Sequence, residues 1–418
     1  MKKVKLLCSI FALGTILFLQ GCIKDTCKHT QSYTWFVPLY KSIQEVRNNI
    51  KSSAAREIKA PGKLFIIGNY IFLNEINKGV HIIDNRNPAL PVNKAFIDMP
   101  GNVDIAVKGN YLYADLYADL VVLDISDPLN VTKIKIAENI FPERIYGITT
   151  DNNKVIYDWV RHDTTINNDC GANIFEQYNG GVVFMLSSDI SASSFAGGAP
   201  SGIAGSMARF SLINNILYTV GNASLNVFDI TSPQNPILSN TVNLNWGIET
   251  IYPFKDRLFI GGNTGMYIFN IANPASPAQL GTFAHARVCD PVIADDKYAF
   301  VTLRNGSTCA GFLNELDVVD ITNLTAPVFI KKYDLTNPHG LSKDGNLLFI
   351  CDGAAGFKIF TASDVNNIQL KKQFTGLETY DVIAYNGLAI VIAQDGLYQY
   401  DYSNSNNIRQ ISKISINQ

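Results

Sequence analysis

The stretch LVVLDISDP, residues 120–128, decides the fold, because phrases of the same form recur along the chain. It joins a run of Leu and Val residues to a tail that begins with Asp124 and ends with Pro128. Similar phrases are GVHIIDNRNP (residues 79–88), LNVFDITSP (225–233), IFNIANP (268–274) and LDVVDITNL (316–324). A short apolar run that is ended by turn-forming residues is typical of a β-strand followed by a tight turn.

The spacing of these phrases indicates one repeated unit. Asp124 follows Asp84 by 40 residues, and Asn270 follows Asp229 by 41. A second apolar run precedes the phrase in each unit, and no sustained helical period appears between residues 61 and 418. Eight units can be placed, at residues 62–98, 100–136, 144–190, 206–244, 246–284, 287–335, 337–374 and 377–417.

A period near 40 residues with about four strands per unit is the signature of a β-propeller. The sequence therefore predicts an all-β fold, a propeller of four-stranded blades over residues 61–418. Eight units favour eight blades. Seven blades are the alternative, if the degenerate unit at residues 144–190 is not a full blade.

The acidic residues of the repeated phrase have a structural explanation. Asp and Ser/Thr side chains bond local backbone N–H groups in tight turns, and Pro ends the ladder because it lacks a donor. We therefore expect Asp84, Asp124, Asp229 and Asp320 to form turns and to take no part in catalysis.

With these phrases in view, residues 61–418 resemble the LVIVD-repeat family, which is named for this strand. The resemblance implies a propeller on a bacterial or archaeal cell surface. It implies no particular activity, because none is attached to the family as a whole.

The N-terminus predicts export. Lysines at positions 2, 3 and 5 precede a mostly apolar run at residues 6–19, which is shorter than the roughly 20 residues that a membrane-spanning helix needs. The following Leu-Gln-Gly-Cys, residues 19–22, resembles a bacterial lipobox. We therefore expect residues 1–21 to be a lipoprotein signal peptide and Cys22 to be lipidated. The alternative is an ordinary secretory signal with a chance Cys.

The next segment, residues 22–60, is expected to hold a lipidated tether and a short element before the ring. Ile43, Val46 and Ile50 have helical spacing, so residues 41–57 could form an amphipathic helix or supply a strand that closes the ring. By resemblance to bacterial lipoproteins, Ile23 after the lipidated Cys implies the outer membrane. Whether the protein faces the periplasm or the outside stays open.

Composition narrows the classes of partner and the chemistry. The 418 residues carry a net charge of −2 and are 47% hydrophobic, which argues against a disordered chain and against nucleic acid as a partner. Five cysteines remain after Cys8 and Cys22, at positions 27, 170, 289, 309 and 351, without a zinc-binding spacing. Since Cys289 and Cys309 would lie on one face of the ring, we expect a disulfide between them. The odd count leaves at least one thiol unpaired.

A candidate binding face follows from propeller topology. The innermost strands of all blades start on the same face, around the mouth of the central channel. Polar or ionisable side chains occupy these starting positions: Lys63, Asp104, Tyr146, Arg209, Glu249, Asp290, His339 and Asp381. They could bind a ligand, or they could form a mutually neutralised, water-filled channel. Four of them are carboxylates that could hold a cation, but no Asp-rich ligand loop is present, so we expect no metal.

Two long segments are expected on the same face. Residues 159–180 would form the loop between the second and third strands of the third unit, and the Ser/Gly/Ala-rich residues 191–205 would lead into the next inner strand. Long loops are uncommon in compact domains unless they are functional or disordered.

These observations predict a non-catalytic cell-envelope lipoprotein, held at the membrane by its lipid and binding a protein or glycan through the channel mouth. Hydrolase and nucleotide-binding signatures are absent from the sequence, and we expect no cofactor. One alternative is a propeller lyase or glycan hydrolase that pairs Asp290 with His339, or Glu249 with Asp104, as acid and base. Another is a scaffold of an envelope complex that uses the blade edges.

Overall fold

The structure is a computed structural model that describes residues 28–144, 151, 153–169, 203–285, 291–305 and 313–416. The described residues form two units. Residues 28–39 and 158–169 make up the first, and the other described residues make up the second. Among the described helices, none has the length and apolar character needed to span a membrane.

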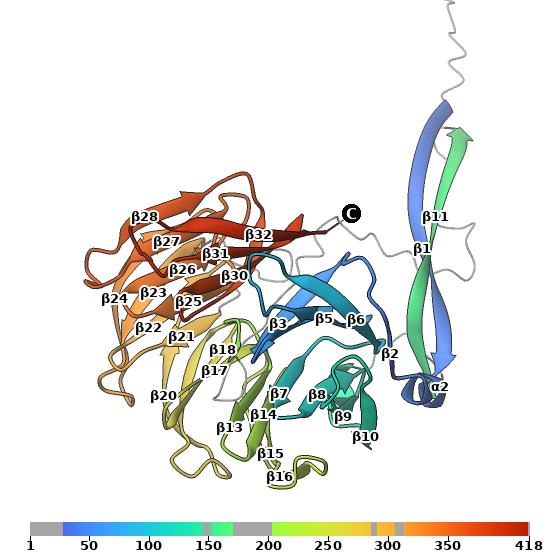
Figure 1. The fold of residues 1–418 in the computed structure, drawn as a ribbon, viewed down its shortest axis with the longest axis horizontal. Helices are drawn as coiled ribbons and strands as arrows, with labels where there is room; N and C mark the ends of the chain where they lie inside the picture. Colours follow the sequence, from blue (N-terminus) through green and yellow to red (C-terminus); the bar gives the residue numbers. More distant parts are fainter. Residues whose placement is uncertain are drawn as a thin grey trace, which may run out of the picture. The chain divides into compact units, whose positions relative to one another are not determined.

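The second unit is a β-propeller of seven four-stranded blades (Figure 1). Blade 1 holds β3 (Pro61–Ile67), β4 (Tyr70–Glu75), β5 (Gly79–Asp84) and β6 (Val92–Asp98). Blade 2 holds β7 (Ile105–Lys108), β8 (Tyr111–Leu116), β9 (Asp119–Asp124) and β10 (Thr132–Ala137). Blade 3 holds β13 (Phe210–Ile213), β14 (Ile216–Val220), β15 (Ser224–Asp229) and β16 (Ile237–Asn243).

The remaining four blades follow in chain order. Blade 4 holds β17 (Ile248–Phe254), β18 (Arg257–Gly262), β19 (Gly265–Asn270) and β20 (Ala278–Ala284). Blade 5 holds β21 (Val292–Ala294), β22 (Tyr298–Leu303), β23 (Glu315–Asp320) and β24 (Val328–Asp334). Blade 6 holds β25 (Leu341–Asp344), β26 (Leu347–Cys351), β27 (Phe357–Thr361) and β28 (Gln369–Phe374). Blade 7 holds β29 (Thr379–Tyr385), β30 (Leu388–Ala393), β31 (Gly396–Asp401) and β32 (Arg409–Ser415).

The prediction of eight blades is wrong, and the alternative of seven is confirmed. The third sequence unit, residues 144–190, supplies one described strand, β11 (Lys154–Asp169), which pairs with β1 (Lys28–Ser42) instead of joining the ring. The prediction that residues 159–180 form a loop within a blade is wrong for the same reason, because residues 159–169 belong to β11. The apolar residues of the third sequence repeat do form a strand, β11, but its partner β1 lies far upstream in the chain.

The repeated phrase forms the third strand of each blade and the turn that follows. In β9 the Oδ1 atom of Asp124 accepts a hydrogen bond of 2.8 Å from the backbone N–H of Ser126. Asp229 and Asp320 do the same for Thr231 and Thr322. The equivalent bond at Asp84 comes from Arg86, whose side chain lowers the pKa of that carboxyl to about 2. The prediction that these four Asp residues form turns is confirmed.

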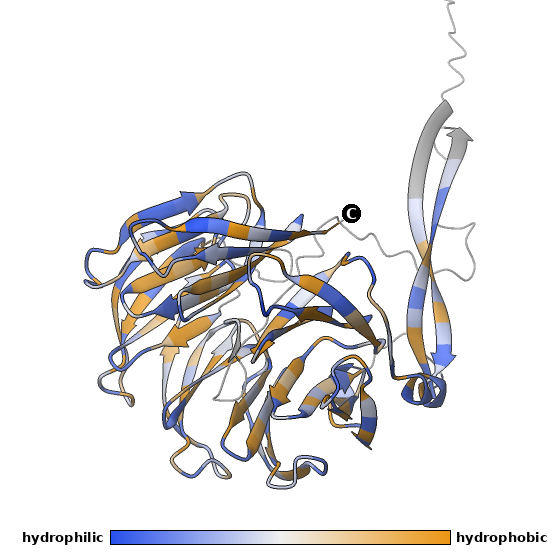
Figure 2. Ribbon diagram, viewed as in Figure 1, coloured by the Kyte–Doolittle hydropathy of each residue, from blue (hydrophilic) through white to orange (hydrophobic). Residues whose placement is uncertain are grey.

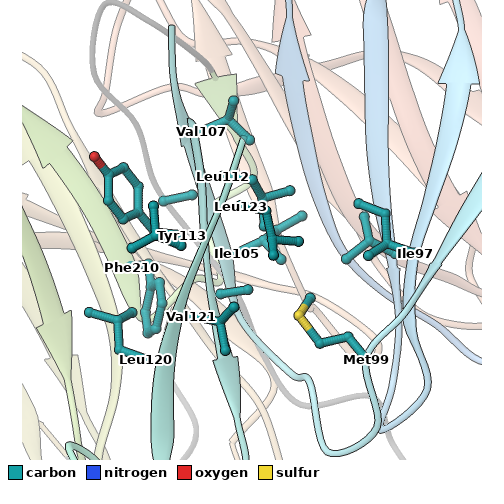
Figure 3. Packing of buried hydrophobic residues seen from close by; sticks show 14 of the residues in the cluster. Ile97, Met99, Ile105, Val107, Leu112, Tyr113, Leu120, Val121, Leu123 and Phe210 are labelled. Atoms are coloured by element: carbon teal, nitrogen blue, oxygen red, sulfur yellow. The ribbon is translucent and has the colours of Figure 1, made fainter. Parts of the chain in front are cut away.

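Each blade buries both faces against its neighbours. Figure 3 shows blade 2, where Tyr113 points toward Phe210 of blade 3 and Leu112 points toward Ile97 of blade 1. The outermost strands are more exposed, and β28 is mostly hydrophilic in Figure 2. Hydrogen bonds also tie blades together, since the Tyr113 and Tyr218 hydroxyls donate to the carbonyls of Pro233 and Pro274 in the next blade.

The ring closes between blades 7 and 1 through side chains, because all four strands of blade 7 are consecutive in the chain. The amides of Asn85 and Gln399 exchange hydrogen bonds of 3.0 and 2.7 Å, and Ser412 donates to the carbonyl of Pro88. An isoleucine- and leucine-rich cluster from β3–β5 and β29–β31 fills the seam.

Two further strands extend blade 1. The helix α2 (Ile43–Asn48), capped by Ser42, leads to β2 (Lys51–Ala54), which pairs with the outer strand β6. Residues 41–57 thus contain both a short helix and a strand, and the strand adds to an outer edge without closing the ring. On the channel side, β12 (Ile203–Ala204) pairs with the innermost strand β3.

The first unit consists of residues 28–39 and 158–169, which belong to the two-stranded ribbon of β1 and β11. The rings of Trp35 and His162 stack with centroids 4.6 Å apart, and the Trp35 indole donates to Thr164. Thr34 donates to Asp163 beside them. These cross-strand pairs hold the two strands together.

Candidate functional site

The described starting positions of the inner strands converge at one mouth of the channel. Lys63, Glu249 and Asp381 lie within the first three residues of β3, β17 and β29. Asp104 and Arg209 directly precede β7 and β13, and His339 lies two residues before β25. Tyr146 and Asp290, which were predicted with them, lie outside the described residues, as do Cys22 and the predicted Cys289–Cys309 disulfide.

One side of the mouth is a dense network of buried ion pairs. Lys63 and Asp104 form a salt bridge, and both are almost fully buried. The second oxygen of Asp104 accepts from Arg144 at 3.0 Å, while its first oxygen also accepts from the backbone N–H of Arg209 at 3.1 Å. Burial acts to raise the pKa of Asp104, but the charges of Lys63, Arg144 and Arg209 outweigh it and hold the pKa below its usual value.

Asp115 completes this network from the end of β8. It forms a salt bridge with Arg144, and its Oδ1 atom accepts from the backbone N–H groups of Val103 and Asp104 at 2.8 and 2.7 Å. The network therefore pairs two carboxylates, Asp104 and Asp115, with two cations, Lys63 and Arg144. Hydrogen bonds from backbone N–H groups hold the carboxylates in place. This side of the mouth resembles the neutralised channel that we considered as an alternative.

Arg209 contacts both the buried ion-pair network and the residues on the other side of the mouth. Its guanidinium donates to the backbone carbonyls of Ile248 and Glu249, at 3.2 and 3.4 Å, and to the Asn222 side chain. Burial raises the pKa of Glu249, while the charges of Arg209 and Arg304 oppose that rise. Arg304 is only 3% exposed, and burial lowers its pKa.

His339 is the next group around the mouth, 2% exposed and in edge-to-face contact with Tyr380. Its carbonyl accepts a hydrogen bond of 2.8 Å from Thr302 in blade 5. Burial, with the charge of Arg304 beside it, lowers the pKa of His339 to about 3. The imidazole is therefore neutral at neutral pH.

Asp381 faces the short segment of residues 203–208 that includes β12 and runs along the channel side of the inner strands, here called the channel segment. A Cβ atom on Gly205 would lie 2.0 Å from the Oδ2 atom of Asp381, and one on Gly340 would lie 2.0 Å from Oδ1. Ser206 accepts a hydrogen bond from the Leu341 amide of β25. The segment thus contacts blades 1, 6 and 7 around the carboxyl, and burial raises the pKa of Asp381 to about 7.

The starting-position rule did not find three charged residues of the mouth. Asp115 and Arg304 lie at the ends of the second strands β8 and β22, and Arg144 lies in the short 3-10 helix η1 (Pro142–Arg144). For Asp115 and Arg304 the signal is an ionisable residue at the end of an apolar second strand, as in YLYADL (residues 111–116) and YAFVTLR (298–304). The predicted positions came only from the starts of the inner strands.

The described mouth does not assemble a metal site. Nowhere in residues 28–144, 151, 153–169, 203–285, 291–305 and 313–416 do three or more His, Cys, Asp or Glu side chains come together as metal ligands would. Asp104, considered as a ligand, forms salt bridges with Lys63 and Arg144 and accepts a hydrogen bond from the backbone N–H of Arg209. Cys351, the free thiol of the described part, is buried in blade 6.

Comparison with known proteins agrees with this architecture. Residues 101–136 and 291–335, which span nearly all of blade 2 and blade 5 from β21 to β24, match the model of the LVIVD repeat. The chain contains LVIVD repeats. The same phrase closes the third strand of blades 1 and 3. A search of curated proteins finds no match to the chain.

Solved structures resemble the LVIVD-repeat ring in fold alone. A protein from Lactobacillus plantarum is 11% identical, with a TM-score of 0.55, and the match covers 85% of this chain and 97% of that one. The computationally designed Ika8 protein is 8% identical with a TM-score of 0.51, covering 85% of this chain and 88% of its own. At such identities these likenesses show the architecture and carry no activity.

Proposed function

We propose that the protein is a non-catalytic binding module of the bacterial cell envelope. In this proposal Cys22 carries the lipid anchor at the outer membrane, and the channel mouth faces a protein or glycan partner. The observation that supports it most is the concentration of buried charge at one end of the ring, where apolar packing would cost less. A rigid ring that holds charged side chains at one mouth is suited to recognition.

An exposed aromatic residue adds to this face. Trp246, in the connection from β16 to β17, is 69% exposed and lies three residues before Glu249. Exposed Trp side chains are enriched at binding interfaces, because one large rigid ring supplies much contact area. Its position at the end of the blades that carries the mouth makes it the natural outer contact for a ligand.

The chemistry of the mouth favours binding over catalysis. His339, with a pKa of about 3, would be a weak general base at neutral pH, because an efficient base has a pKa near the working pH. Asp104 is held by Lys63 and Arg144 and is not free to accept a substrate proton.

The test is a glycan and protein array probed with the full chain and with two matched variants. Trp246→Ala should lower the signal of the bound partner at least threefold. Tyr385→Ala, which removes an exposed aromatic ring at the opposite end of the blades, should leave the signal unchanged. Equal signals from all three proteins would contradict the assignment of the face.

The membrane anchor is tested separately, in cells. Wild-type protein should sediment with the outer membrane, whereas Cys22→Ser should appear in the soluble fraction or remain as the uncleaved precursor. Two acyl chains anchor a protein stably, so the expected shift is nearly complete. Sedimentation of both proteins in the same way would refute lipidation at this Cys.

A scaffold role is the second candidate, favoured by the rim of the ring. Large apolar side chains are exposed at the start of several outer strands, namely Val92, Ile237, Val328, Phe329 and Leu370. Array binding that depends on Phe329 and not on Trp246 would favour this second function.

A further inference from the structure

Two buried donor groups, the His339 ring and the Arg304 guanidinium, lie at the mouth without a described side chain that accepts from them. The amide of Asn337 lies 3.3 Å from Nε2 of His339 and donates to it, so the proton of the neutral ring is on Nδ1. This Nδ1 atom is buried and has no hydrogen-bond partner. A buried donor without an acceptor is destabilising, and a bound acceptor would recover that loss.

Arg304 is the second donor group. It follows Thr302 by two residues, so both side chains leave β22 on the same face, and Thr302 contacts His339 directly. No described residue accepts a hydrogen bond from the Arg304 guanidinium, and its charge acts on His339. Thr302 donates to the backbone carbonyl of His339, and the charge of Arg304 acts on the His339 ring, so the two donor groups belong to the same part of the mouth.

The local charges select the kind of acceptor. Arg304 forms no ion pair with a described carboxylate; the charge of Glu249 acts on it, but burial raises the pKa of Glu249 and so favours the uncharged form of that group. Arg209 already donates to backbone carbonyls and to Asn222, so Arg304 is the cation with donors to offer. A monoanion would match the single charge of Arg304, so that neither charge is buried without a partner.

We infer that Arg304 and the Nδ1–H of His339 bind a single carboxylate group at the channel mouth. The planar fork of Arg matches the two oxygens of a carboxylate, and the imidazole N–H supplies a further donor. This inference rests on the proposed binding function and names the group that the mouth recognises. The carboxylate could belong to a small free acid or to a uronic-acid residue of a glycan.

Isothermal titration of the full chain in detergent tests the inference. The probes are acetate, D-glucuronate and the neutral D-glucuronamide. Glucuronate should bind at least tenfold more tightly than glucuronamide. The amide carries no charge, and its NH₂ group would face the N–H donors of Arg304 and His339. Acetate binding as well as glucuronate indicates a small-acid site, whereas a clear preference for glucuronate indicates the uronic acid of a glycan. Either result supports the carboxylate.

Variants locate the bound group. Arg304→Gln should weaken glucuronate binding at least tenfold, and His339→Phe, which keeps a ring against Tyr380, should weaken it severalfold. Arg409→Gln, an exposed arginine on β32, is the matched control and should bind like wild type. Unchanged melting temperatures would show that the variants are folded.

The inference is overturned if glucuronamide binds as well as glucuronate, if no carboxylate probe binds, or if folded Arg304→Gln binds like wild type. The proposed function fails separately, through the array variants at Trp246. Array binding that needs Trp246 but tolerates Arg304→Gln would keep the binding face and reject the carboxylate.

Discussion

The buried carboxyl of Asp381 makes the stability of the ring depend on pH. Its side chain is 3% exposed, and burial raises its pKa from an ordinary value of 3.8 to about 7. The folded protein therefore binds a proton at this site between about pH 4 and pH 7, where the unfolded chain has already lost it. The free energy of unfolding should thus fall as the pH rises through this window.

The size of the effect follows from the shift in pKa. One unit corresponds to about 1.4 kcal/mol, so a rise from 3.8 to about 7 corresponds to about 4 kcal/mol of stability lost by pH 8. Asp381→Asn removes the titration and keeps an oxygen that can accept from the Val382 amide. The variant should therefore gain stability relative to wild type as the pH rises.

The assay is urea unfolding followed by circular dichroism between pH 4.5 and pH 8.5. The difference in unfolding free energy between Asp381→Asn and wild type should increase by several kcal/mol across this range. Other buried carboxyls, such as Asp317 with a pKa of about 6, titrate in both proteins and cancel in the difference. Asp256→Asn, at an exposed turn, is the control. Parallel curves for Asp381→Asn and wild type would refute the reasoning.

Further predictions concern the same ring. Lys63→Met should lower the free energy of unfolding by about 3–5 kcal/mol in urea titrations, because it removes one partner of a buried ion pair and leaves the other, Asp104, among fewer cations. Tyr218→Phe should cost about 1–3 kcal/mol in the same assay, since the carbonyl that its hydroxyl reaches in the next blade loses its partner. Gly205→Ala should lower the melting temperature, because its Cβ would overlap the carboxylate of Asp381; an unchanged melting temperature would show that the channel segment does not pack as described.

Most of the fold could be predicted from residues that lie close together in the sequence. The turn phrase predicts a strand end from side chains within three residues of each other, and Asp124 with Ser126 shows why this works. The inner-strand positions were predictable for the same reason, because the repeat fixes the register. His339 and Asp381 could therefore be placed at the mouth from the sequence.

Features set by distant pairing could not be predicted in this way. The third unit has the apolar runs of a strand, but β11 pairs with β1, which lies more than a hundred residues upstream. The pairing of β12 with β3 leaves even less trace, since it rests on backbone hydrogen bonds of a two-residue strand in a Ser/Gly/Ala-rich stretch. The contact between Arg144 and Asp115 depends on how the connection after blade 2 folds back.

The pairing of β12 with β3 has a consequence for how the molecule is assembled. The innermost edge of the first blade is completed by residues that are synthesised only after the whole second blade, and directly before the third. Such long-range closure slows folding, because a large loop must be ordered before the contact is gained. The pairing also links the first blade to the third, because β12 leads directly into β13. If the seam between the first and last blades opens, β3 therefore stays hydrogen-bonded to the segment that precedes the third blade.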